Sequence, residues 1–170
     1  GDMGVSYVSK TDVFDTYMEK LPATIKLSFA SILVSILLSV PLGIYSATRQ
    51  GTVQDNISMI VAMIGLSMPN FWLGLLLIIV FSLNLGWFPS GGDQTMSSIV
   101  LPAITIGTGL MATLTRTTRS SMLDVLKQEY LRTARAKGIP EKIVITSHAL
   151  RNALIPIITI IGTQLAGVLG

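Results

Sequence analysis

Four long runs without a charged residue constrain this chain more than any other feature. They cover residues 27–48, 56–92, 94–115 and 152–170. A helix needs about 20 apolar residues to cross the hydrocarbon core of a bilayer, and the first, third and fourth runs each have that length. Charged residues make up only 12% of the chain, whereas a soluble domain has about 25%. The sequence therefore predicts an all-α membrane protein with about four transmembrane helices.

The second run is too long for one straight crossing, and Pro69 divides it. Its 37 positions would extend over about 55 Å as a helix, well beyond the hydrocarbon core of a bilayer. Proline lacks an N–H donor and disfavours helix at the preceding residue. Residues 67–70 should therefore kink or break the helix. Residues 71–85 can then continue across the membrane, and residues 85–93 should form an exit loop.

The distribution of charge predicts how the chain is oriented. Residues 116–151 contain eight Lys and Arg against three acidic residues, a net charge of +5, whereas residues 1–26 have a net charge of −1. Because basic loops between apolar spans stay in the cytoplasm, we expect residues 1–26 to form an external segment and residues 27–115 three spans. Residues 116–151 are then a cytoplasmic loop, and residues 152–170 begin a further span. We expect the whole chain to be a fragment of a longer membrane protein.

The basic loop has the signals of two helices joined by a tight turn. Residues 121–137 can continue inward from the third span, and Gly138 suits the left-handed conformation that often ends a helix. Pro140 is well placed as the first residue of a second helix, over residues 140–150. Such a knuckle could dock a partner protein, or it could be an ordinary basic loop held at lipid headgroups. The residues alone leave both interpretations open.

Several functions are disfavoured by what the sequence lacks. It has no cysteine and one histidine, His148, which argues against disulfides and an ordinary His/Cys metal site. It has no phosphate-binding loop, and no carboxylate pair in a span that would suggest a proton relay. The basic residues flank apolar spans rather than a soluble face, which disfavours nucleic acid. We expect no catalytic residue, metal or bound cofactor in this chain. An ion-coupled transporter and a scaffold protein remain as alternatives.

Two motifs in the loop resemble the EAA loop of binding-protein-dependent ABC importer permeases. They are RTARAKG, starting at Arg132, and SHALRNALIP, ending at Pro156. The general pattern is E-A-A, three residues, G, nine residues and I-x-L-P. Gly138 matches the glycine and Ala134 the second alanine, whereas Arg132 stands in place of the glutamate. Such departures are typical of the dipeptide/oligopeptide/nickel branch, and the chain most resembles the first permease subunit of these systems.

The resemblance implies a type I ABC importer transmembrane domain in a bacterial or archaeal cytoplasmic (inner) membrane. It implies a translocation path for peptides or a related small solute, which an extracytoplasmic binding protein delivers. A second permease subunit, identical or homologous, would complete the path within the lipid. Partner ATPase subunits would use ATP and Mg, so this chain would not itself be an enzyme. Dipeptides, oligopeptides, nickel and glutathione all remain possible substrates.

The resemblance also assigns residues to roles. The region 129–140 would be the coupling helix that contacts the ATPase, through Glu129, Arg132, Ala134, Arg135, Ala136, Lys137, Gly138, Ile139 and Pro140. Ala134 and Ala136 are small enough to admit side chains of a partner closely, and the basic residues offer charge to an acidic rim. Candidate gate or hinge positions are Pro41, Pro69, Gly107 and Gly109, although simple helix packing also explains the glycines.

Overall fold

The computed structural model describes Gly4, residues 10–92 and residues 95–169, and every regular element in this part is helical apart from one isolated bridge residue. The elements in chain order are α1 (Val13–Thr48), α2 (Val53–Ser67), α3 (Asn70–Leu77), the π-helical η1 (Ile78–Asn84), the 3-10 helix η2 (Met96–Ile99), α4 (Val100–Leu126), α5 (Glu129–Ala136), α6 (Glu141–Ile143), the π-helical η3 (Val144–Ala149) and α7 (Leu150–Leu169).

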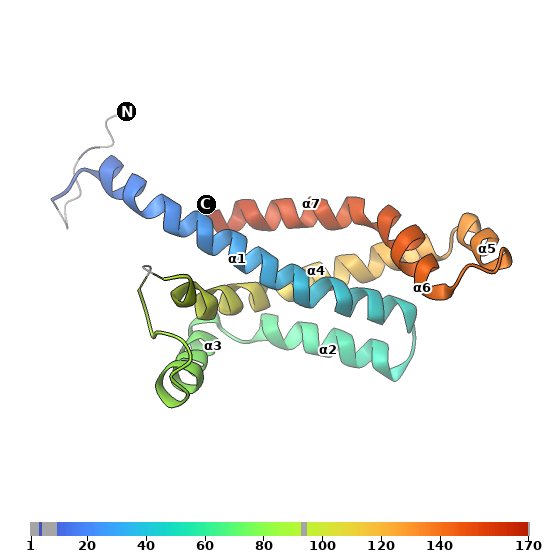
Figure 1. The fold of residues 1–170 in the computed structure, drawn as a ribbon, viewed down its shortest axis with the longest axis horizontal. Helices are drawn as coiled ribbons and strands as arrows, with labels where there is room; N and C mark the ends of the chain where they lie inside the picture. Colours follow the sequence, from blue (N-terminus) through green and yellow to red (C-terminus); the bar gives the residue numbers. More distant parts are fainter. Residues whose placement is uncertain (1–3, 5–9, 93–94, 170) are drawn as a thin grey trace.

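The long helices α1, α4 and α7 lie side by side with α2 (Figure 1). The helices α1 and α4 run toward the same end of the bundle, and α2 and α7 run back from it. That end holds the α1–α2 turn, the end of α4, α5 and α6, and we call it the basic end.

The described part contains the expected set of spans. Three helical stretches are long and apolar enough to cross a membrane: Val13–Thr48, Met96–Leu126 and Glu141–Leu169. A fourth candidate consists of Val53–Ser67 and Asn70–Asn84, which are bent by 95° with respect to one another. The bend lies at Met68 and Pro69, so the predicted break at Pro69 is confirmed.

Small residues allow α1 and α4 to approach each other closely. The buried positions of α1 are mostly serine, glycine and alanine. A Cβ atom on Gly43 would lie 2.6 Å from the Cβ atom of Thr118, and one on Gly107 would lie 2.8 Å from the carbonyl oxygen of Ser31. The Ser39 hydroxyl donates a hydrogen bond to the Met111 carbonyl oxygen over 3.2 Å. Gly107 therefore serves helix packing in this conformation.

Helix α1 begins at Val13, well before the start of the first apolar run at residue 27. Asp12 caps it by accepting a hydrogen bond from the Phe14 N–H group, and Pro22 lies inside the helix. The charged residues between Val13 and residue 27 end the apolar run but do not end the helix, because Lys and Glu are good helix formers.

The basic loop differs from the two-helix prediction at both helices. The expected helix over 121–137 is wrong, because α4 ends at Leu126 and α5 starts only at Glu129. This break lets α5 turn back so that Leu131 is buried. The expected separate helix over 140–150 is also wrong, since it continues through η3 into α7 as one stretch, Glu141–Leu169. No proline or glycine interrupts residues 141–155, so nothing local ends the helix.

We predict that Gly107→Ala destabilises the bundle. The added Cβ atom would press on the Ser31 carbonyl oxygen of α1, and overpacking of this kind costs about 1–3 kcal/mol. Gly162→Ala in α7 is the matched control, because no atom lies within 4 Å of its Cβ position and alanine favours helix. Thermal unfolding in detergent, followed by circular dichroism, measures both. Equal unfolding temperatures for the two variants would contradict the close α1–α4 contact.

Candidate functional site

Helix α5 is anchored to the bundle through one apolar face. Leu131 is fully buried and Ala134 is 8% exposed. Both belong to an apolar cluster at the basic end that is formed with residues of α1, α4, η3 and α7: Ala47, Leu114, Met122, Val144, Ala149, Ala153 and Ile157. Full burial of a leucine side chain contributes about 1.5–3 kcal/mol to the stability of the fold. The short helix is therefore held in place by tertiary packing rather than by its own propensity.

The burial of Ala134 corrects one expectation. Both alanines were expected to admit the side chains of a partner, but Ala134 faces the apolar cluster of its own chain. Ala136 is exposed, as are Arg132, Arg135 and Lys137. The outer face of α5 and its cap that a partner can reach contains these four residues together with the exposed Thr133, Glu129 and Tyr130.

Gly138 ends α5 in the left-handed conformation that its sequence position predicted, with φ at +76°. Its N–H group donates to the Arg135 carbonyl oxygen over 2.9 Å, and the Ile139 N–H group donates to the Ala134 carbonyl oxygen over 3.3 Å. This pair of bonds is the Schellman motif, which satisfies the free carbonyl groups at a helix end. Ile139 packs against the apolar cluster, so both hydrogen bonds and apolar packing fix the conformation of the turn.

An ion pair joins the two arms of the knuckle, by which we mean α5, the turn at Gly138 and α6. Arg135 donates from Nε and Nη2 to the two carboxylate oxygens of Glu141, over 3.0 and 2.9 Å. The hydrogen bond to Glu141 raises the pKa of the Arg135 guanidinium above its usual range. Arg132 pairs with Glu129 one turn earlier on α5. Exposed pairs of this kind contribute only about 0–1 kcal/mol each, so they shape the surface more than they stabilise it.

Tyr130 ties α5 to the start of α7. The Asn152 side-chain amide donates to the Tyr130 hydroxyl oxygen over 2.7 Å and to the His148 carbonyl oxygen over 3.1 Å. His148 thus takes part through its backbone. This link joins residues that are 22 positions apart, and no motif in the sequence indicated it.

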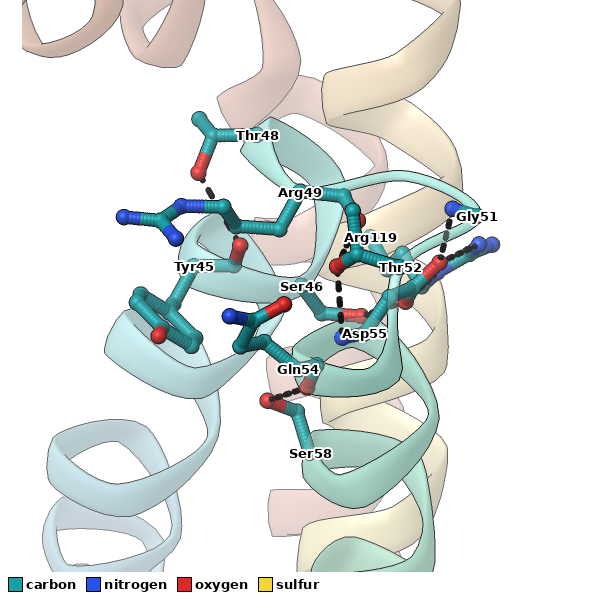
Figure 2. A network of polar contacts seen from close by, with 10 residues as sticks. All are labelled: Tyr45, Ser46, Thr48, Arg49, Gly51, Thr52, Gln54, Asp55, Ser58 and Arg119. Carbon is teal, nitrogen blue, oxygen red and sulfur yellow. Dashed lines mark hydrogen bonds and ion pairs between the residues drawn. The ribbon is translucent and has the colours of Figure 1, made fainter.

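A second polar network, at the α1–α2 turn, was missed entirely by the sequence analysis (Figure 2). Asp55 lies in the first turn of α2 and is 2% exposed. One of its carboxylate oxygens accepts hydrogen bonds from Arg119 Nε, over 2.7 Å, and from the Ser46 hydroxyl. The other accepts from Arg119 Nη2, over 2.6 Å, and from the Gly51 N–H group, over 3.0 Å. The residues come from α1, α2 and α4, so this carboxylate joins three helices.

The four candidate gate or hinge residues do not form one site. Pro69 and Gly109 do come together, because a Cβ atom on Gly109 would lie 3.0 Å from the Asn70 side-chain oxygen, next to the break at Pro69. Gly107 packs against α1 instead, and Pro41 is exposed within α1. A hinge at the α2–α3 break stays a prediction for Pro69 and Gly109.

Within the residues that the structure describes, no three His, Asp or Glu side chains come together as a metal site. One buried carboxylate is fully paired with an arginine, and one exposed basic helix projects from the bundle (Figure 1).

The fold defines a multi-pass helical membrane protein with an exposed helical knuckle at one end. Residues 39–170 match the family described as the binding-protein-dependent transport system inner membrane component. The chain belongs to this family, and its place is the cytoplasmic (inner) membrane.

Its relatives include permeases of two kinds of system. The chain is 46% identical to the oligopeptide transport system permease protein AppB of Bacillus subtilis, in an alignment that covers 100% of this chain and 57% of the relative. It is 41% identical to the glutathione transport system permease protein GsiC of Escherichia coli (strain K12), covering 100% of this chain and 56% of the relative. A GsiC protein from Pectobacterium atrosepticum is 42% identical over the same share. The chain thus spans little more than half the length of these relatives.

We predict that Gly138→Ala loosens the knuckle without a steric clash. No atom lies within 4 Å of the Cβ position, but φ is +76°, and the left-handed conformation costs an L-residue about 1–2 kcal/mol. Asparagine tolerates this conformation better, so Gly138→Asn should have a smaller effect. Hydrogen–deuterium exchange of the α5 amides measures the difference. Exchange equal to that of the unmodified protein in both variants would show that the cap contributes nothing.

Proposed function

We propose that this chain forms part of the translocation subunit of an ATP-driven importer. Its helices contribute to a path for a peptide or a related small solute, which an extracytoplasmic binding protein delivers. A second permease subunit, identical or homologous, completes the path within the lipid bilayer. The chain itself carries out no chemistry, because ATP and Mg are used by partner ATPase subunits in the cytoplasm.

The observation that carries this proposal is the knuckle. It projects from the basic end of the bundle (Figure 1), it is anchored by Leu131 and Ala134, and its outer face is exposed. A rigid helix of this kind can transmit a displacement to the bundle, because close-packed interiors transmit strain. Membership of a binding-protein-dependent transport family supports a cytoplasmic ATPase as the partner, and the proposed contact is at residues 129–140.

Peptides are the substrate class that the relatives favour. The names of the relatives refer to oligopeptide and to glutathione, and glutathione is itself a small peptide. Nickel transport belongs to a related branch and is the second candidate. The described residues contain no metal-ligating cluster, so a nickel substrate would have to be bound elsewhere or as a complex.

We predict that a cysteine in place of Ala136 crosslinks to a cytoplasmic ATPase in native membranes. Ala136→Cys would be made in the full-length protein without other cysteines, and the captured protein identified by mass spectrometry. Ala136 is exposed on α5, so a docked partner lies within reach of a short crosslinker. Ser90→Cys is the matched control, because Ser90 is also exposed but follows η1 in the loop at the opposite end of the bundle.

A bulky residue at Gly138 tests whether docking depends on the shape of the knuckle. Gly138→Val should still insert into the membrane but lose the ATPase crosslink at Ala136, since valine is strained at positive φ. Capture of no ATPase from Ala136, Thr133 or Lys137 would overturn the proposal. The knuckle would then be only a basic loop that sets the topology.

A further inference from the structure

The basic end connects the knuckle to three helices of the bundle by different means. The end of α4 is linked to α5 through the chain itself, and the end of α1 contributes Ala47 to the apolar cluster that holds α5. Among the described residues, no side chain of α2 belongs to that cluster. Helix α2 instead packs against α4, where a Cβ atom on Gly65 would lie 2.7 Å from the Thr108 carbonyl oxygen, so it is connected to the knuckle only indirectly.

Near the basic end, α2 is joined to α4 by the ion pair between Asp55 and Arg119, which we call the clamp (Figure 2). Asp55 stands at the start of α2, and Arg119 lies seven residues before the end of α4 at Leu126, about 10 Å along the helix axis. Two residues separate that end from Glu129, where α5 begins. The clamp thus lies on the direct route from the knuckle to α2.

The geometry of the clamp allows little freedom. The guanidinium of arginine is a planar fork, and a bidentate contact fixes both distance and orientation. The remaining acceptor positions of the carboxylate are used by Ser46 and by Gly51. The Asp55 side chain is 3% exposed and that of Arg119 27%, so water screens the pair far less than it screens the pairs on the knuckle.

We propose that Asp55 and Arg119 are positioning residues that make α2 move together with α4 when a partner displaces the knuckle. This inference rests on the proposed function, because it needs an ATPase that moves α5. The far end of α2 leads into the break at Pro69 and so into α3. A displacement at the knuckle is thereby carried through the clamp to the bent segment on the opposite side of the bundle.

The experiment follows α2 and α5 at the same time. Nitroxide labels would be attached to Ile57→Cys on α2 and Ala136→Cys on α5, both of which are exposed. The full-length permease would be assembled with its partner subunits in lipid nanodiscs, and the distance between the labels measured by pulsed electron paramagnetic resonance with and without ATP and vanadate. With the clamp intact, we expect one narrow distance distribution in both states.

Asp55→Asn should uncouple the two helices. We expect the distribution to broaden in the nucleotide-bound state and the amount of solute transported per ATP to fall about tenfold, a usual size for coupling between sites. Arg119→Lys, which keeps the charge but loses the bidentate fork, should have an intermediate effect. Arg116→Gln is the matched control, since Arg116 is an exposed arginine one turn earlier on α4 and forms no ion pair with a described residue.

A double variant, Arg119→Gln combined with Asp55→Asn, separates a positioning role of the ion pair from a purely stabilising one. Arg119→Gln alone leaves a buried, unpaired carboxylate, which lowers stability strongly. Combining it with Asp55→Asn removes that charge, so the thermal stability should recover. A positioning role predicts that transport per ATP nevertheless stays low in the double variant. Recovery of both quantities together would overturn the inference, because the pair would then act on stability alone.

One further result would also count against this inference. An unchanged distance distribution and unchanged transport per ATP in both Asp55→Asn and Arg119→Lys would show that α2 follows α4 without the clamp. Should Asp55→Asn fail to insert, Arg119→Lys gives the same two readouts. By contrast, failure of Ala136→Cys to crosslink to a cytoplasmic ATPase would refute the proposed function first, whatever the state of the clamp.

Discussion

The close contact between α1 and α4 is the constraint on which the basic end depends. Glycine and hydroxyl side chains line it, and a single methyl group at Gly43 or Gly107 would overlap the facing helix. Because the two helices run in the same direction, this contact places Ser46 near the end of α1 beside Arg119 of α4. Asp55 can then accept from both at once. The close approach of the α1 and α4 backbones therefore makes the ion pair possible; the ion pair does not cause that approach.

Apolar and polar contacts play different parts around the knuckle. The apolar cluster beneath α5 fixes where the helix lies, and the Schellman turn at Gly138 fixes where it ends. On the outer face, Arg132 pairs with Glu129 and Arg135 pairs with Glu141, in contacts that water screens. Such ion pairs can exchange partners at a low cost in free energy. The charged side chains of this face can therefore adapt to a partner while the backbone of α5 stays fixed.

The sequence predicted those features that a local rule determines. A proline in an apolar run indicated the break at Pro69, and a glycine after a helical segment indicated the left-handed cap at Gly138. It did not predict the burial of Ala134, because which face of an eight-residue helix is buried depends on the surrounding helices. Nor did it predict the pairing of Asp55 with Arg119, since these residues are 64 positions apart and hydropathy treats each only as an interruption between apolar runs.

Helix α7 shows why the bundle depends on its surroundings. Ile155 is 75% exposed, and an apolar helix with so little burial inside its own chain is stable only in lipid or against other helices. The contacts that hold it within this chain include Ala153 and Ile157 in the apolar cluster, the bond from Asn152 to the Tyr130 hydroxyl, and Gln164, whose side-chain amide donates to the Leu110 carbonyl oxygen over 3.1 Å. In hydrocarbon an unsatisfied amide costs several kcal/mol. One such bond can therefore fix the register of α7 against α4 while its outer face remains free to pack against other helices.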